Sequence, residues 1–241
     1  FKLFDGHIIE GVLIPSGNRM TACISSQVGC NLACKFCATG MTRYIRNLNF
    51  DEIFDQVAVI AGMARKEHDA TLTHIVYMGM GEPLANYANT LKSIQILTCD
   101  FGLGMSNRRI TVSTCGLAPQ IVQLGNDICI NLAVSLNAPD DETRNRLMPI
   151  NKKYPLQALL DACKKYPMPG RRLLTFEYIL IDGINSSRAD AEKLARLLKN
   201  QRCKLNLIVF NEYPGSVFKS PSLKDVEAFQ QILLDRHFTT M

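Results

Sequence analysis

Three cysteines in this sequence have the clearest capacity for inorganic chemistry. Cys30, Cys34 and Cys37 have the spacing C-x3-C-x2-C. Thiolates are soft anionic ligands that suit zinc or iron–sulfur clusters. A structural zinc site needs four ligands, and the next histidine or cysteine after the three is His68. The spacing therefore favours a cubane cluster with one iron left open to a small molecule, over a zinc site or three incidental thiols.

A second chemical signal is the sequence G-M-G-E-P at residues 79–83. Glycines let a backbone approach a ligand closely. A carboxylate beside them can accept a hydrogen bond from an ammonium group. We predict that Gly81 and Glu82 bind a small cofactor. The alternative is that the glycines only turn the chain.

Small polar residues stand at the ends of three more of the strand-like segments. They are Ser113, the sequence Ser135-Leu136-Asn137, and Asn211. Such groups can hold an adenosine and its ribose by hydrogen bonds. Turn formation or helix capping is the alternative for each of them.

Strand-like and helix-like segments alternate along the chain. Short β-branched segments cover residues 20–26, 73–79, 109–114, 130–136, 173–181 and 204–210. Amphipathic segments cover residues 51–66, 88–99, 155–166, 188–199 and 223–236. This alternation predicts a parallel sheet with right-handed crossovers. Ligands bind at the carboxyl ends of such strands, where the polar residues above fall.

The expected fold class is therefore α/β, an open partial (β/α)6 barrel. Residues 237–241 are a candidate final strand. An Asp5-Gly6 turn between two apolar runs predicts a β-hairpin within residues 1–19. Residues 20–241 then form the barrel core.

Composition excludes several other classes. The chain has 241 residues, of which 47% are hydrophobic and 20% charged, so it is not disordered. No long apolar run predicts a membrane span, and the first residues lack the layout that is expected of a signal peptide. Nine cysteines are an odd number for a disulfide framework, so we expect a cytoplasmic protein with reduced thiols.

Basic residues are the only sequence signal for a polyanionic partner. The net charge is +5, which is mild. Four cations lie within residues 144–153, and Arg171-Arg172, Lys35, Arg43 and Arg46 add to them. We predict contacts with an RNA backbone, although a charged run is also typical of an ordinary solvated face.

Taken in order, the motifs resemble one family, the RlmN/Cfr radical SAM methyltransferases, which act on adenosine in RNA. The matching segments are residues 22–30, Cys34, residues 37–40, 79–83, 113–116, 135–139 and 148–155. The resemblance implies a [4Fe-4S] cluster on the three cysteines and S-adenosylmethionine on its free iron. It also implies methylation of carbon 2 of an adenosine in 23S ribosomal RNA and in tRNA. The alternatives are methylation at carbon 8, as in the Cfr branch, and a non-catalytic metal-bearing RNA-binding module.

The resemblance also implies a mechanism, because carbons 2 and 8 of adenine are not nucleophilic. One S-adenosylmethionine methylates an enzyme cysteine, and a second is cleaved reductively to a radical that activates this methyl group. A second cysteine then resolves the protein–RNA crosslink as a disulfide. Cys23 matches the resolving cysteine and Glu10 a proton acceptor, whereas Cys115 stands where we expect a small hydroxyl residue.

The same resemblance leads to further expectations about partners and chain length. We expect an electron donor such as flavodoxin and a monomeric enzyme. The methyl-carrying cysteine is expected after Met241, and an RNA-binding domain before Phe1.

Overall fold

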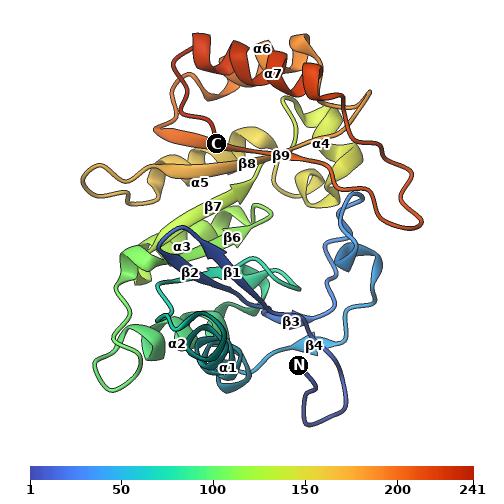
Figure 1. Cartoon of the computed structure of the whole chain (residues 1–241). Coiled ribbons are helices and arrows are strands. Elements are labelled where there is room, and N and C mark those ends of the chain that lie inside the picture. Colours follow the sequence, from blue (N-terminus) through green and yellow to red (C-terminus); the bar gives the residue numbers. More distant parts are fainter. The chain divides into compact units, whose positions relative to one another are not determined.

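The computed structural model describes all residues 1–241 and divides into two compact units (Figure 1). The N-terminal unit contains Phe1–Asn31, Thr42–Thr114 and Asp127–Leu132. The C-terminal unit contains Leu32–Met41, Cys115–Asn126 and Ala133–Met241. Each unit contains strands and helices, and strand β7 (Asn131–Ser135) crosses the division.

The strands of the N-terminal unit form a mixed arrangement with one antiparallel edge. β1 (Val12–Ser16) pairs antiparallel with β2 (Arg19–Cys23). β2 pairs parallel with β5 (His74–Tyr77), which pairs parallel with β6 (Ile110–Thr114). The carboxyl ends of these three parallel strands therefore share one edge.

Two helices cover the apolar strands of the N-terminal unit. α1 (Phe50–His68) and α2 (Tyr87–Thr98) pack against each other, as Figure 1 shows. The buried hydroxyl of Tyr77 hydrogen-bonds the hydroxyl of Ser93 at 2.8 Å. α1 begins after Asn49 and contains the predicted amphipathic segment 51–66. The fully buried apolar side chains of the two helices are Ile53, Val57, Ile60, Ala64, Ile94 and Leu97.

The strands of the C-terminal unit are parallel. β7 (Asn131–Ser135) pairs with β8 (Leu174–Leu180), which pairs with β9 (Cys203–Val209). The chain end adds to this arrangement, because Thr240 forms a parallel bridge with Leu205. The candidate final strand in residues 237–241 is thus confirmed as a short bridge.

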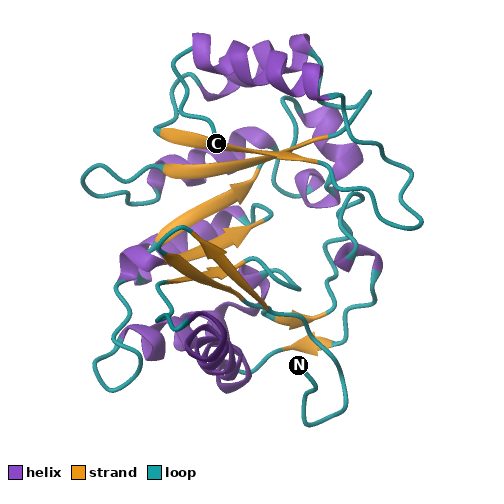
Figure 2. Ribbon diagram, viewed as in Figure 1, coloured by secondary structure: helices purple, strands orange, loops and turns teal.

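Five helices belong wholly or mainly to the C-terminal unit. They are α3 (Ala118–Asp127), α4 (Asp141–Leu147), α5 (Leu156–Lys165), α6 (Arg188–Leu198) and α7 (Leu223–Asp235). In Figure 2, α6 and α7 form a layer beside strands β8 and β9. The rings of Tyr178 and Phe229 join strand and helix, with centroids 5.4 Å apart.

The six predicted core strands are the six parallel strands of the structure, and the five predicted helices all form. The sequence analysis missed α3, whose pattern contains Pro119 and Gly125, and α4, which is short and highly charged. The Asp5-Gly6 turn does reverse the chain, with a bridge between Lys2 and Ile8. β1 lies within the second apolar run of the predicted hairpin, but it pairs with β2 and not with the first residues of the chain. No helix has the length and apolar character needed to cross a membrane.

Candidate cluster and cofactor site

The three cysteines lie on a loop whose ends are tied together. β3 (Gln27–Val28) pairs antiparallel with β4 (Arg46–Asn47). Gly29 follows with φ +73°, and a side chain there would clash with the carbonyl oxygen of Arg43. Glycine is therefore required directly before Cys30. The loop places Cys30 in the N-terminal unit and Cys34 with Cys37 in the C-terminal unit.

Cys34 is the most firmly anchored of the three thiols. Its side chain is buried in a cluster with Leu147, Met148, Ile181 and Phe210. The amide of Cys37 donates to the carbonyl oxygen of Cys34 at 3.2 Å. These contacts fix the second and third thiols of the motif relative to each other.

A fourth cysteine lies against Cys34. The sulfur of Cys115 is 3.8 Å from the sulfur of Cys34, within reach of a sulfur hydrogen bond. Cys115 directly follows β6. From the sequence, Cys115 was notable only because a small hydroxyl residue is expected at its position. The contact could not be predicted, because 81 positions separate the two residues and no spacing rule connects them.

The G-M-G-E-P segment is held by the residues that follow β2. The amide of Met80 donates to the hydroxyl oxygen of Ser25 at 2.8 Å, and the amide of Glu82 donates to the side-chain oxygen of Gln27 at 2.8 Å. Gly81 has φ +96°, and an added Cβ would lie 2.5 Å from the Cβ of Gln27. The backbone at residues 79–82 is therefore rigidly placed at the end of β5.

Glu82 is a buried carboxylate, with only 1% of its surface exposed. One of its oxygens accepts the amide of Leu84 at 3.0 Å, at the start of the 3-10 helix Pro83–Asn86. Ser113 lies on the neighbouring strand β6, next to buried Thr114. Gly81, Glu82 and Ser113 thus belong to one edge of the N-terminal unit, as their positions after strands predicted.

The corresponding edge of the C-terminal unit carries Ser135, Leu136, Asn137 and Asn211. The amide of Leu136 donates to the carbonyl oxygen of Glu177 at 2.9 Å. Asn137 is buried with φ +58°, and its side-chain oxygen accepts the amide of Ile179 at 2.9 Å. Asn137 therefore serves the fold, whereas Asn211 is exposed after β9.

Arg144 corrects one sequence prediction. It was expected to contact RNA with its neighbours, but it is completely buried, with 0% of its surface exposed. Its guanidinium donates to the carbonyl oxygens of Cys115 at 2.7 Å, Ser135 at 3.0 Å and Leu136 at 3.0 Å. It also donates to the side-chain oxygen of Asn151 at 2.9 Å. Of that basic run, the cations at the surface are Arg146, Lys152 and Lys153.

The two residues predicted for later chemical steps both lie in the N-terminal unit. Cys23 is the last residue of β2, half-buried between Val12 of β1 and Val76 of β5. Glu10 is exposed just before β1, and its backbone carbonyl accepts the hydroxyl of Ser25 at 2.6 Å. Ser25 also binds Met80, so the backbone at Glu10 is connected through one side chain to the G-M-G-E-P segment.

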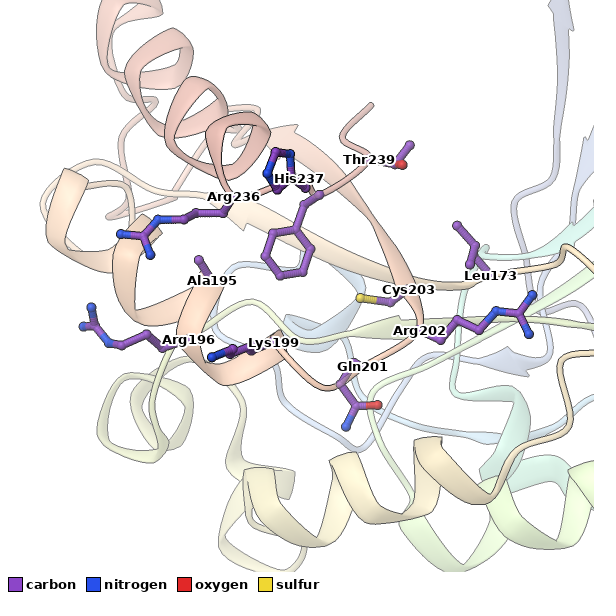
Figure 3. Close-up of a pocket in the computed structure, with 11 residues that line it drawn as sticks. Leu173, Ala195, Arg196, Lys199, Gln201, Arg202, Cys203, Arg236, His237 and Thr239 are labelled. Carbon is purple, nitrogen blue, oxygen red and sulfur yellow. The ribbon is translucent and has the colours of Figure 1, made fainter.

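A basic pocket of about 520 Å³ lies at the start of β9, between the ends of α6 and α7 (Figure 3). The sequence analysis missed it because its cations come from separate segments. Arg236 forms an ion pair with Glu192 at 2.8 Å, and burial raises the pKa of Cys203 to about 12. The basic residues of its lining are Arg196, Lys199, Arg202, Arg236 and His237.

Comparison with known proteins agrees with this architecture. The radical SAM superfamily profile matches residues 24–198. The dual-specificity RNA methyltransferase RlmN of Syntrophus aciditrophicus is 58% identical over 241 residues, which cover 100% of this chain and 69% of that protein. RlmN of Geobacter sulfurreducens is 52% identical over 241 residues, or 100% of this chain and 65% of that protein. The chain thus spans about two thirds of these relatives.

Solved structures agree with the sequence relatives. A radical SAM methyltransferase from Sphaerobacter thermophilus has a TM-score of 0.96 and 46% identity, covering 100% of this chain and 70% of that one. Streptococcus suis SuiB bound to S-adenosylmethionine shares the fold, with a TM-score of 0.64 and 12% identity over 93% of this chain and 51% of that one. Radical SAM enzymes use a [4Fe-4S] cluster with S-adenosylmethionine. The predicted open partial barrel is confirmed, and the chain belongs to the radical SAM superfamily and, within it, to the RlmN family.

Proposed function

We propose that this protein methylates carbon 2 of an adenosine in 23S ribosomal RNA and in tRNA. The observation that carries the proposal is the identity of 58% to a dual-specificity RNA methyltransferase over the whole chain. The three-cysteine loop and the rigid strand-end segments support the proposed cofactor binding. The activity belongs to the full-length protein.

Cys30, Cys34 and Cys37 are the proposed ligands of the [4Fe-4S] cluster. An electrostatic observation supports an anionic centre beside Cys34. Arg144 is a buried cation with no ion pair, and it binds the backbone of Cys115, whose sulfur touches that of Cys34. Buried charges are normally compensated, and an anionic thiolate-bound cluster would do this.

Residues at both strand edges are the proposed ligands of S-adenosylmethionine. We assign Glu82 as the acceptor for the ammonium group, and the hydrogen bond from its amide to Gln27, which fixes its backbone, supports this role. The other proposed contacts are Gly81, Ser113, Ser135, Leu136, Asn137 and Asn211. The side-chain oxygen of Asn137 already accepts the amide of Ile179. We therefore assign Asn137 to shaping the backbone of the S-adenosylmethionine site.

The cluster and S-adenosylmethionine supply the one-electron chemistry needed to functionalise an unreactive ring carbon. The protein itself must then manage sulfur and proton transfers. We assign Cys23 as the thiol that forms a disulfide with the methyl-carrying cysteine, and Glu10 as the proton acceptor. Glu10 is exposed to solvent, which allows it to pass a proton on to water.

RNA contact requires cations that can reach phosphates. With Arg144 buried, we assign this role to Arg146, Lys152 and Lys153 and to the basic pocket at the start of β9. The pocket has four permanent cations in its lining and no carboxylate there. Each phosphate contact releases counterions, so binding should weaken as salt increases.

The test is a methylation assay with the full-length protein. It is reconstituted anaerobically with iron and sulfide, supplied with S-adenosylmethionine, a reductant and either RNA, and the digested nucleosides are analysed by mass spectrometry. We expect 2-methyladenosine from both RNAs, and a covalent RNA adduct with Cys23→Ala. 8-Methyladenosine would assign the Cfr-type reaction instead, and stoichiometric zinc without product would assign a non-catalytic module.

A further inference from the structure

Arg144 is an unusual residue because its charge is buried without a countercharge. Its guanidinium makes four hydrogen bonds, all to neutral oxygens. No carboxylate lies within ion-pair distance of it. Moving an uncompensated cation out of water is strongly unfavourable, so proteins pair such charges or place them beside a metal centre or ligand.

The nearest carboxylate is separated from Arg144 by a neutral amide. Asn151 accepts from Arg144 and donates to the carboxylate of Asp141 at 2.8 Å. Asp141 is exposed, so water screens much of its charge. Burial lowers the pKa of Arg144, while Cys115, Cys34, Asp141 and Cys163 act in the opposite direction. Apart from Asp141, the groups that oppose this effect of burial are three cysteines, and Cys34 is one of the proposed cluster ligands.

Arg144 also joins the two kinds of site residue within the C-terminal unit. One nitrogen of its guanidinium binds the carbonyl oxygens of both Cys115 and Ser135. Cys115 touches the cluster ligand Cys34, and Ser135 begins the segment assigned to S-adenosylmethionine. A displacement of the Arg144 side chain would therefore alter the backbone at both Cys115 and Ser135.

We propose that Arg144 is a positioning residue that acts as the built-in counter-ion of the cluster. A reduced cluster carries one more negative charge than an oxidised one, so a buried cation stabilises the reduced form more. Arg144 thus raises the reduction potential, and its hydrogen bonds keep Cys115 and Ser135 in register with the cluster. This inference rests on the proposed function, because it requires a cluster on Cys34.

Two variants separate the charge of Arg144 from its hydrogen bonds. Arg144→Gln removes the charge, and Arg144→Lys keeps it while losing the planar group. Arg146→Gln, on the exposed side of the same helix, is the matched control. The readouts are iron and sulfide content, thermal unfolding, and the midpoint potential from a redox titration followed by electron paramagnetic resonance.

A charge-neutral swap keeps the test valid if the buried arginine cannot be replaced without loss of the fold. Asn151→Asp combined with Asp141→Asn moves one carboxylate next to the guanidinium and leaves the net charge unchanged. The exchanged groups have nearly the same shape, so the bond from Arg144 to residue 151 and one bond between residues 151 and 141 can be kept, with the direction of the second reversed. The swap neutralises Arg144 electrostatically without removing it.

We expect Arg144→Gln and the swap each to lower the reduced-to-oxidised ratio about tenfold at a fixed potential, about 59 mV for one electron. Arg144→Lys should change the ratio less than threefold, and Arg146→Gln should leave it unchanged. A full cluster with an unchanged potential in both Arg144→Gln and the swap would overturn the inference alone. Equal shifts in the Lys and Gln variants with none in the swap would also overturn it. An unsubstituted protein that binds no iron would instead overturn the proposed function.

Discussion

The sulfur atoms of Cys34 and Cys115 lie 3.8 Å apart in the C-terminal unit, although the residues are separated by 81 positions. A disulfide requires about 2.05 Å between the sulfurs, so a small movement would join them. The proposed cluster protects Cys34 from this reaction by occupying its sulfur.

Removal of the cluster should therefore allow the thiols of Cys34 and Cys115 to be oxidised. After chelation of iron under anaerobic conditions, diamide should oxidise the two thiols to a Cys34–Cys115 disulfide and be reduced itself. Peptide mapping by mass spectrometry should detect the crosslinked pair in the apoprotein and not in the cluster-loaded protein. Cys115→Ser should abolish it. Buried Cys163, whose pKa is raised to about 12, should stay reduced throughout.

Gly81 should tolerate no side chain. Gly81→Ala adds a Cβ at 2.5 Å from Gln27 and at φ +96°, so we expect a loss of about 1–3 kcal/mol in unfolding free energy. The affinity for S-adenosylmethionine should also fall, which equilibrium dialysis can measure. Gly62→Ala is the control, since Gly62 lies in α1 with open space around it, and should stabilise the protein by about 1 kcal/mol. Equal behaviour of the two variants would contradict the assigned role of Gly81.

The ion pair at the base of the cysteine loop should make the free energy of unfolding depend on pH in the acidic range. The guanidinium of Arg46 binds both carboxylate oxygens of Glu52, at 2.7 and 2.8 Å, and holds the pKa of Glu52 below its ordinary value. The stabilisation is complete above the unfolded-state pKa of about 4.5 and is lost as the pH falls through the lower folded-state pKa.

Replacing Glu52 tests this dependence. Glu52→Gln should lower the unfolding free energy by about 1.5–3 kcal/mol at pH 7, and the difference from the unsubstituted protein should shrink in acid. Urea titrations at several pH values measure both effects. Glu67→Gln, at an exposed position of the same helix, should change neither. A deficit that is constant across the pH range would show that the ion pair is not its source.

The basic pocket should contribute to RNA affinity in a salt-dependent way. Lys199→Ala with Arg202→Ala removes two cations, so the slope of log affinity against log salt should become shallower by about 1.4–1.8. Fluorescence anisotropy with labelled tRNA measures the slope. Lys66→Ala, at an exposed position of α1, is the control. An unchanged slope in the double variant would exclude the pocket from the RNA contact surface.

Local patterns in the sequence were enough to predict the strands, because each parallel strand has its own apolar run and each helix its own amphipathic stripe. Helix α4 was not predicted because its sequence, DETRNRL, has only one apolar residue. Its buried residue Arg144 is of a type that normally lies at the surface. The burial of Arg144 follows from four hydrogen bonds to three separate segments, and no spacing rule encodes these. The Cys34–Cys115 contact and the basic pocket were missed for the same reason.

The division of the chain has a consequence for dissection experiments. The polypeptide passes between the two units five times, and strand β7 itself is shared, with Leu132 in one unit and Ala133 in the other. No single cut separates the two units cleanly, because any fragment that holds one complete unit also carries segments of the other. A nick at any of the five crossings would leave at least one unit divided between two chains, which favours loss of structure as a single all-or-none event.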